Sequence, residues 1–293
     1  MSMDLFIDQL VNGIVQGAIY ALLAISWSVV VGITGMVTFA HGDVMVIGTF
    51  ASFYAFQYFG NNILLGLLAA FGVTWLLGIA IFKVCNERFF NAPRHISLMC
   101  TIGASIMIMN LAQIIFGPQR FPMRNIVPLR IFYIGPVRLL STQIMIIATV
   151  IALAILLTLL FNRTRFGLKL KTVSQNRDAA SLMGINVRRT AMIGNSLGCA
   201  LGGVAGMLLG LHYQTFVATM GGSLGMKAFS AGVVGGLTDV RFSALGGLLI
   251  GIAENLGIAF TTASLRDVFA FVFLILILFF RPQGFGKKGG VKV

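Results

Sequence analysis

A few ionisable and amide side chains interrupt the long apolar stretches of this sequence. His41 and Asp43 stand where one stretch begins, Asn195 lies inside another, and Glu254 and Asn255 lie inside a third. A charge at the centre of a bilayer costs at least about 2.5 kcal/mol on insertion scales, so such residues usually face a bundle interior or a water-filled path. For Glu254 a role in a path or gate and a structural hydrogen bond between helices are both open at this point.

Enzyme signatures in the chain are weak. Two segments match G-x-S-x-G, at 194–198 and 221–225, but a nucleophile elbow needs a strained turn between a strand and a helix, which neither setting provides. A membrane serine protease would pair Ser196 with His41 or His212 of a neighbouring helix, and nothing in the sequence brings them together. The histidines and cysteines are too scattered to predict a metal site.

The chain also has no G-x-x-x-x-G-K-[ST] motif. If the protein moves a solute uphill with ATP, a separate polypeptide must therefore hydrolyse that ATP. We expect no cofactor bound by this chain.

The composition predicts a membrane protein. Of 293 residues, 58% are hydrophobic and only 10% are charged, with a mean hydropathy of +0.95. Because soluble domains carry about a quarter charged residues, a soluble enzyme is excluded. At about 20 residues per crossing we expect an all-α polytopic membrane protein, a bundle of eight or nine transmembrane or re-entrant helices in one domain over residues 1–293. The apolar spans are 10–32, 36–59, 63–84, 96–117, 142–162, 190–211, 226–238, 243–262 and 266–281.

Two of these spans look incomplete. Span 36–59 opens with the run from Thr38 to Asp43, which suggests a broken or re-entrant start. Asp43 could instead cap a helix, with Gly42 breaking the chain before it. Span 226–238 is short for about 30 Å of hydrocarbon at about 1.5 Å per residue, which favours a half-helix.

The formal net charge of +13 is spread over loops between spans, so we interpret it as a determinant of orientation and expect no nucleic-acid partner. Fifteen Lys and Arg residues fall on one side of the membrane, and six fall on the other: Arg120, Arg124, Arg130, Arg138, Lys227 and Arg266. The larger set marks the cytoplasm, which places the N-terminus in the periplasm and the C-terminus in the cytoplasm. The loop at 118–141 carries four Arg and four of the six prolines. We expect it to be an extended extracytoplasmic excursion, either a rigid solvated loop or a contact for an acidic partner.

Glycine recurs every four residues through one span, at Gly194, Gly198, Gly202, Gly206 and Gly210. Small residues at this spacing let another backbone approach closely, so we expect tight helix packing, with a flexible, moving helix as the alternative. Two shorter pairs repeat the spacing, Gly13 with Gly17 and Gly247 with Gly251.

The longest cytoplasmic loop, 163–189, is amphipathic. We expect Ser174 to cap a short helix that runs to about Met183 and Gly184 to end it in a left-handed conformation. Such a helix suits a docking partner, although a helix lying on anionic lipid would show similar residues.

One part of this loop resembles the coupling-helix motif of ABC importer permeases: Gln175-Asn176-Arg177-Asp178-Ala179-Ala180, then three residues, then Gly184-Ile185. Three further stretches agree with the branched-chain amino acid branch of that family, the LivH-like permeases. They are Gly17-Ala18-Ile19-Tyr20-Ala21-Leu22, Phe39-Ala40-His41-Gly42-Asp43, and Met226-Lys227-Ala228-Phe229 leading to Gly235-Gly236-Leu237. The resemblance covers residues 9–286.

The resemblance implies a subunit of a bacterial inner-membrane importer. Its partners would be two ABC ATPase subunits, a second related permease or second copy, and a periplasmic substrate-binding protein, which the 118–141 loop is a candidate to contact. The resemblance further implies that the helix at 174–184 docks on an ATPase. The coupling residues would be Gln175, Asn176, Arg177, Asp178, Ala179, Ala180 and Gly184. The substrate-path candidates are Thr38, His41, Gly42, Asp43, Asn195, Glu254 and Asn255.

Two departures from the family pattern bear on the substrate. Thr38 stands where the family usually has Asn, and 238–242 reads Thr-Asp-Val-Arg-Phe where small residues and a proline are usual. We expect branched-chain or other neutral amino acids, with urea or short amides as the alternative. A gradient-driven secondary transporter using Asp43 and Glu254 is the rival from another class.

Overall fold

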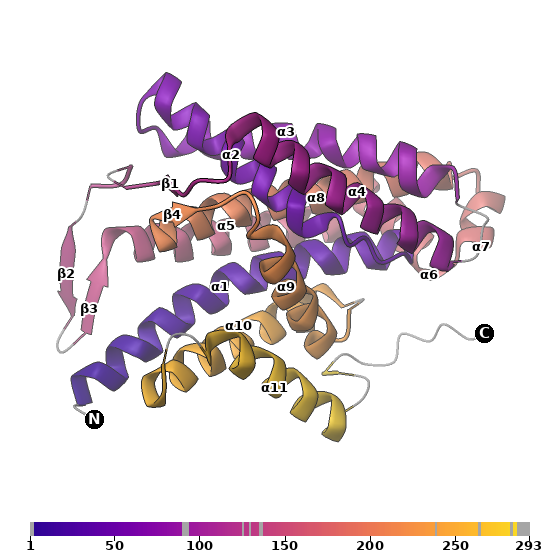
Figure 1. Cartoon of the computed structure of the whole chain (residues 1–293). Helices are drawn as coiled ribbons and strands as arrows, with labels where there is room; N and C mark the ends of the chain where they lie inside the picture. The colour runs from indigo at the N-terminus through magenta and orange to yellow at the C-terminus, as the bar shows by residue number, and fades with distance from the viewer. Residues whose placement is uncertain are drawn as a thin grey trace.

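The computed structural model describes residues 3–89, 94–124, 126–128, 130–134, 137–237, 239–262, 265–281 and 284–285. These residues form a helical bundle with two small two-stranded sheets (Figure 1). Thr238, Pro136 and the lysines after Arg281, which the sequence arguments used, lie outside the described residues. The helices are α1 (Met3–Thr34), α2 (His41–Phe59), α3 (Ile63–Ile81) with a π-helical end (Phe82–Glu87), α4 (Arg94–Phe116), α5 (Ser141–Arg163), α6 (Arg165–Gln175), α7 (Arg177–Leu182), α8 (Val187–Tyr213), α9 (Gly221–Gly235), α10 (Val240–Phe260) and α11 (Arg266–Phe280).

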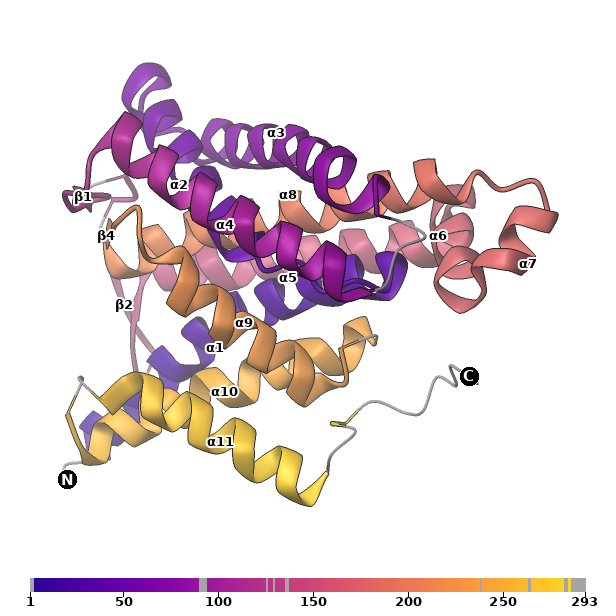
Figure 2. The same cartoon turned by 45° about the vertical axis from the view of Figure 1, so that its right-hand side comes forward.

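The helices α1 and α8 form the centre of the bundle. In each, 89% of the most apolar 18-residue window is buried, whereas the corresponding windows of α4 and α5 are 17% buried. The helices α2, α3 and α4 lie on one side of this pair, and α10 and α11 lie on the other (Figures 1 and 2). The apolar surface of the outer helices, including Leu76, Ile114 and Phe279, is exposed, as expected of helices that face lipid.

Among the described residues, six helical segments are long and apolar enough to cross a membrane: Ile7–Thr34, Ile63–Glu87, His95–Phe116, Ser141–Arg163, Val187–Tyr213 and Val240–Phe260. The prediction of a polytopic helical membrane protein is confirmed, and the count of eight or nine segments is not. The helices α9 and α11 have 15 residues each, which gives about 22 Å at about 1.5 Å per residue. The expected shortness of the 226–238 span is thus confirmed, although α9 begins earlier, at Gly221.

The glycine stripe of α8 packs tightly, as predicted. A Cβ at Gly206 would collide with the Met45 carbonyl of α2, and one at Gly198 would lie 2.8 Å from the Ser26 carbonyl of α1. The shorter glycine pairs face each other across α1 and α10, where a Cβ at Gly17 would lie 2.9 Å from the Leu248 carbonyl. These close backbone approaches compensate the low helix propensity of glycine.

The start of span 36–59 differs from one expectation. After α1 ends at Thr34, Gly35 turns the chain with φ +60, and α2 begins at His41. Asp43 is not a helix cap, because it lies inside α2, which begins at His41. The capping position is Ala40, and it makes no side-chain capping bond. Gly42 does not break the chain either: it lies within α2 and packs against the backbone of α9.

The loop at 118–141 is extended, as predicted, and pairs with itself and with a distant segment. The strand β1 (Phe121–Pro122) pairs antiparallel with β4 (Thr215–Phe216), which follows α8. The strands β2 (Ile131–Ile134) and β3 (Val137–Leu140) form a hairpin with Ile131 opposite Leu140. This hairpin and the α6–α7 segment lie at opposite ends of the molecule (Figures 1 and 2).

Candidate coupling helix and translocation path

The 163–189 loop folds into two capped helices rather than one. Thr164 caps α6 by accepting a hydrogen bond from the Gly167 amide at 3.0 Å, and Asn176 caps α7 by accepting one from the Ala179 amide at 3.0 Å. The prediction that Ser174 is the cap is wrong. Its hydroxyl donates to the Lys171 carbonyl at 2.8 Å within the last turn of α6. Because Asn176 is an equally good capping type, only the preceding helix decides between the two.

The helix α7 contains four of the seven predicted coupling residues, and its last residue and the residue after it form an apolar pair that points outward. Leu182 is 88% exposed and Met183 is 80% exposed, whereas Ala180 is fully buried. Gly184 adopts φ +76 and ends the helix as predicted, with the Ile185 amide donating to the Ala180 carbonyl at 3.1 Å. An exposed apolar pair on a short, well-capped helix at one end of the bundle is the kind of surface that a partner protein covers.

The first four path candidates lie together where α2 begins. The ring of His41 is buried, with Nε2 2.8 Å from the Ser26 hydroxyl of α1. That hydroxyl donates to the Leu23 carbonyl at 2.6 Å, so the His41 Nε2–H is the donor to Ser26. The carboxylate of Asp43 accepts a hydrogen bond from the Ser105 hydroxyl of α4. The start of α2 thus joins polar groups of α1 and α4 inside the bundle.

Asn195 lies elsewhere and joins two helices. Its amide donates to the Gly78 carbonyl of α3 at 2.9 Å, where α3 and α8 pack closely. This bond is a structural link between helices, and it does not place Asn195 with His41 and Asp43.

Glu254 belongs to a buried network of charges between α9, α10 and α11. Its Oε1 lies 3.1 Å from Lys227 Nζ and 3.2 Å from Arg266 Nε, and Lys227 also pairs with Asp267 at 2.6 Å. We call Lys227, Glu254, Arg266 and Asp267 the charge quartet. Its two positive and two negative groups balance, which reduces the cost of burying Lys227 and Glu254.

Amide and phenol groups extend the quartet to α1 and α8. Gln16 donates to Glu254 at 3.0 Å and to the Tyr20 hydroxyl at 2.7 Å, and it accepts from Asn255 at 2.8 Å. Arg266 donates to the Tyr213 hydroxyl at 2.9 Å. Sequence reasoning found Glu254 and Asn255 but missed these partners.

Lys227 in particular was counted among the extracytoplasmic loop charges, but it is 3% exposed and lies inside α9. The sequence does contain a signal for this ion pair, because a lysine in one apolar span and a glutamate in another each need a partner inside the membrane.

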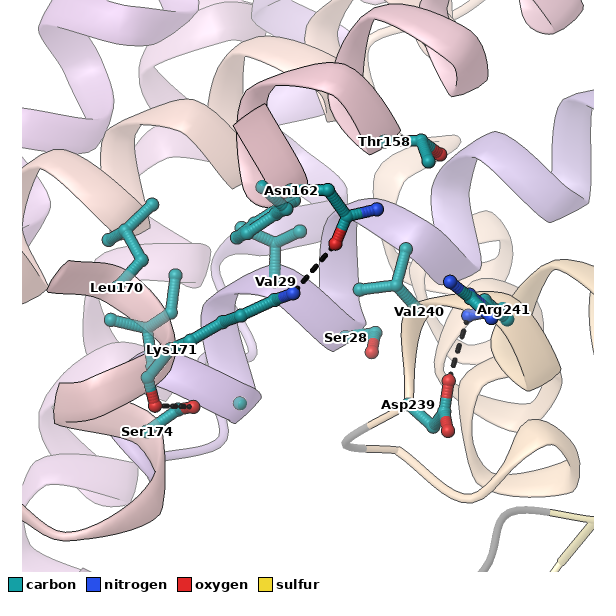
Figure 3. Close-up of a pocket in the computed structure, with 13 residues that line it drawn as sticks. Ser28, Val29, Thr158, Asn162, Leu170, Lys171, Ser174, Asp239, Val240 and Arg241 are labelled. Atoms are coloured by element: carbon teal, nitrogen blue, oxygen red, sulfur yellow. Dashed lines mark hydrogen bonds between the residues drawn. The ribbon is translucent and has the colours of Figure 1, made fainter. Parts of the chain in front are cut away.

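A further cavity of about 350 Å³ lies at the end of the bundle that carries α6. It is bounded by α1, α5, α6 and α10, and Figure 3 shows its polar groups. Lys171 donates to Asn162 at 2.7 Å on one side, and Asp239 accepts from the Arg241 amide at 3.0 Å on the other (Figure 3). The cavity therefore lies between α6, which directly precedes α7, and the helices α1 and α10.

Together these features define a class of protein: a polytopic helical membrane protein that buries polar and charged groups inside its bundle and presents a short capped helix at one end. The family model described as "Branched-chain amino acid transport system / permease component" matches residues 9–278, so the chain belongs to that family.

Curated relatives agree over nearly the whole chain. It is 33% identical to the high-affinity branched-chain amino acid transport system permease protein BraD of Pseudomonas aeruginosa, covering 95% of each chain. It is also 33% identical to LivH of Escherichia coli K12, over 95% of this chain and 94% of the relative. A probable LivH of Methanocaldococcus jannaschii is 28% identical over 93% and 90%. No solved structure gives a significant match.

Proposed function

We propose that this chain is a membrane permease subunit of an ATP-driven ABC importer for branched-chain or other neutral amino acids. The observation that carries the proposal is α7, whose capped helix, exposed Leu182 and Met183 and left-handed Gly184 realise the coupling-helix motif. Family membership and the names of the relatives support the substrate class. The chain performs no covalent chemistry and acts by alternating access.

In this proposal α7 docks on one of two ABC ATPase subunits. Asn176 caps the helix, Ala180 anchors it to the bundle, and Leu182 and Met183 enter the ATPase surface. Gln175, Arg177, Asp178 and Ala179 complete the contact segment. Closure of the ATPase pair would then move α7 and bias the bundle between inward and outward states. The ATPases bind and hydrolyse ATP, and this chain holds no cofactor.

The other partners follow from the two ends of the molecule. A second related permease, or a second copy, would pair with this chain in the bacterial inner membrane, and a periplasmic substrate-binding protein would contact the end that carries the hairpin. The N-terminus would then lie in the periplasm and the C-terminus in the cytoplasm, which is the orientation that the loop charges predict. No nucleic acid takes part.

The solute path in this proposal passes the start of α2, where Thr38, His41, Gly42 and Asp43 lie, and reaches the cytoplasm near the cavity beside α6. We assign the charge quartet to a gate, because Glu254 contacts groups from three other helices that would have to separate in a rocking motion. Asn255 supports this gate through Gln16, and Asn195 holds α8 to α3.

Co-purification tests the proposal. A tagged chain isolated from its native membrane should bring ATPase subunits with it, and replacing Leu182 and Met183 with Asp should reduce their recovery at least tenfold. The matched control is Leu168→Asp on α6, which changes a residue that is also exposed, at 65%, and should keep the ATPases. Recovery of a functional chain without any ATPase would overturn the proposal in favour of a gradient-driven transporter.

A further inference from the structure

A cavity of about 280 Å³ lies between α1, α4 and α9, next to the start of α2. We propose that it is the binding site for a zwitterionic α-amino acid with an apolar side chain. The inference rests on the proposed function and identifies where this chain would bind the transported solute. The cavity is lined by Trp27, Phe39, Ser105, Gly222, Met226 and Phe229, among others, and its volume suits a ligand smaller than drug-sized molecules.

Two buried polar atoms beside this cavity have no hydrogen-bond partner among the described residues. They are the Oδ1 atom of Asp43 and the Nε1–H group of Trp27. Both residues are almost completely buried, at 3% and 2% exposure. Because buried polar groups are nearly always paired, a matching acceptor and donor on a ligand would satisfy both.

Asp43 lies just behind the cavity wall, and its carboxylate contacts two of the lining residues. One oxygen, Oδ2, accepts the Ser105 hydroxyl bond, and Ser105 lines the cavity. The other oxygen, Oδ1, lies so close to Gly221, a second lining residue, that a Cβ there would collide with it. A buried carboxylate oxygen without a hydrogen-bond partner, next to a cavity in a low-dielectric interior, attracts an ammonium group.

Asp43 also differs from the other buried carboxylate. Glu254 lies within 3.2 Å of both Lys227 and Arg266. In the part of the chain that the structure describes, no Lys or Arg forms an ion pair with Asp43. The charge of Glu254 is balanced within the protein, whereas the charge of Asp43 is available to a cationic group from outside.

Trp27 supplies the complementary hydrogen-bond donor, its indole N–H, and two aromatic rings pack against its side chain. Its ring centroid lies 5.2 Å from that of His41, edge-on, and 5.2 Å from that of Phe229. An indole N–H can only donate, so it suits a ligand carboxylate. The first turn of α9 borders the same cavity at Gly221 and Gly222.

The remaining walls are apolar. Phe39 and Phe229 lie with centroids 6.3 Å apart, and Ile102 and Met226 complete this side. A site with one acceptor, one donor and an apolar wall selects a small zwitterion with a hydrocarbon side chain over urea, which is uncharged and has no such side chain.

Tryptophan fluorescence tests this site directly, because the chain has only two tryptophans. In the purified complex with the Trp75→Phe substitution in this chain, Trp27 is this subunit's remaining tryptophan. Any tryptophan signal of the other subunits is subtracted with a matched Trp27→Phe, Trp75→Phe complex. Leucine should change the Trp27 emission saturably, whereas 3-methylbutylamine and 4-methylpentanoate, which each lack one charged group, should bind at least tenfold more weakly.

Substitution then separates the two contacts. Asp43→Asn should weaken leucine binding at least tenfold and leave 4-methylpentanoate binding within twofold, since only the amine loses its partner. Glu87→Gln is the control, because it removes a carboxylate at the π-helical end of α3, away from the cavity and from the charge quartet, and should keep leucine binding within twofold. Equal leucine affinity in Asp43→Asn and the unaltered complex would overturn the site.

Two further measurements keep the outcomes distinct. If Asp43→Asn does not fold, Phe229→Ala tests the wall and should raise the affinity for phenylalanine relative to leucine at least fivefold; an unchanged ratio would count against the site. ATP-dependent leucine uptake by the unaltered complex tests the proposed function separately. Absence of that uptake would overturn the function, whereas normal uptake with an unchanged KM in Asp43→Asn would overturn only the site.

Discussion

The guanidinium of Arg177 lies against Gly35, so close that a Cβ at Gly35 would sit 3.0 Å from its Nη2 atom. Arg177 is the first residue of α7, and Gly35 follows the last residue of α1. The contact therefore connects the proposed ATPase-docking helix to the segment that leads into Thr38 and His41. We therefore expect a displacement of α7 to reach the start of α2 through this contact.

We expect Gly35→Ala to disturb this connection. Gly35 has φ +60, so alanine costs about 1–2 kcal/mol of backbone strain and also presses on Arg177. Gly60→Ala is a matched control, because Gly60 has φ +72 but a Cβ there would meet nothing within 4 Å. Both variants should lose similar stability in thermal unfolding, while only Gly35→Ala should lower solute uptake per ATP hydrolysed, by several-fold. Equal uptake per ATP hydrolysed in the two variants would show that the contact between Gly35 and Arg177 does not contribute to coupling.

Gly184 offers a second test of coupling. Its φ of +76 requires a residue that tolerates the left-handed region, and a Cβ there would meet nothing within 4 Å. We expect Gly184→Val to disrupt the end of α7 and uncouple ATP hydrolysis from uptake, whereas Gly184→Asn should retain most coupling, because Asn adopts this conformation more readily. The measurement is uptake and ATPase rate in proteoliposomes. Unchanged uptake by Gly184→Val at normal expression would contradict the prediction.

The two candidate caps of the coupling segment give opposite expectations. Asn176→Ala removes the bond to the Ala179 amide, which should destabilise α7 by about 1 kcal/mol and weaken ATPase retention about fivefold. Ser174→Ala removes only a bond to the Lys171 carbonyl within α6 and should retain the ATPases. Titration of the isolated membrane complex with salt, followed by measurement of the bound ATPase, distinguishes them. A larger effect of Ser174→Ala would restore the assignment that the sequence alone suggested.

The features that the sequence predicted well are those that depend on local spacing. The four-residue glycine period of α8 fixes small residues along the helix surface, and the contacts of Gly198 and Gly206 follow from that geometry. Gly184 likewise ends α7 because its local sequence favours a left-handed residue there. In contrast, Ser174 and Asn176 are both good caps, and the choice depends on how far α6 extends from Thr164.

Features that depend on contacts distant in sequence were predicted less well. Lys227 looked like a loop charge because its partner Glu254 lies 27 residues further on, and Arg266 and Asp267 come from yet another helix. The predicted count of eight or nine membrane segments is not confirmed, because six helical segments among the described residues are long and apolar enough to cross a membrane. Apolar content alone does not distinguish a helix that crosses the membrane from one that the bundle buries, and most of the first half of α2 is buried.

The charge quartet supplies the last test, because a gate and a structural brace respond differently to the same change. Glu254→Gln removes the negative charge between Lys227 and Arg266 but leaves Lys227 its pair with Asp267. We expect the variant to fold with its ATPases bound and to change the uptake rate at least fivefold. Removing one partner of a buried pair typically costs about 3–5 kcal/mol, so a loss well below that range is expected here, where Asp267 remains.

A double-mutant cycle with Lys227→Met separates the two roles of Glu254. If the pair acts as a gate, the double variant should regain stability relative to the sum of the single variants while uptake stays altered, because the groups that must separate are still missing. Thermal unfolding of the assembled complex and uptake in proteoliposomes are measured on the same preparations. If Glu254→Gln only lowers the amount of folded protein and the uptake per folded complex is normal, Glu254 is a structural residue and the gate assignment is wrong.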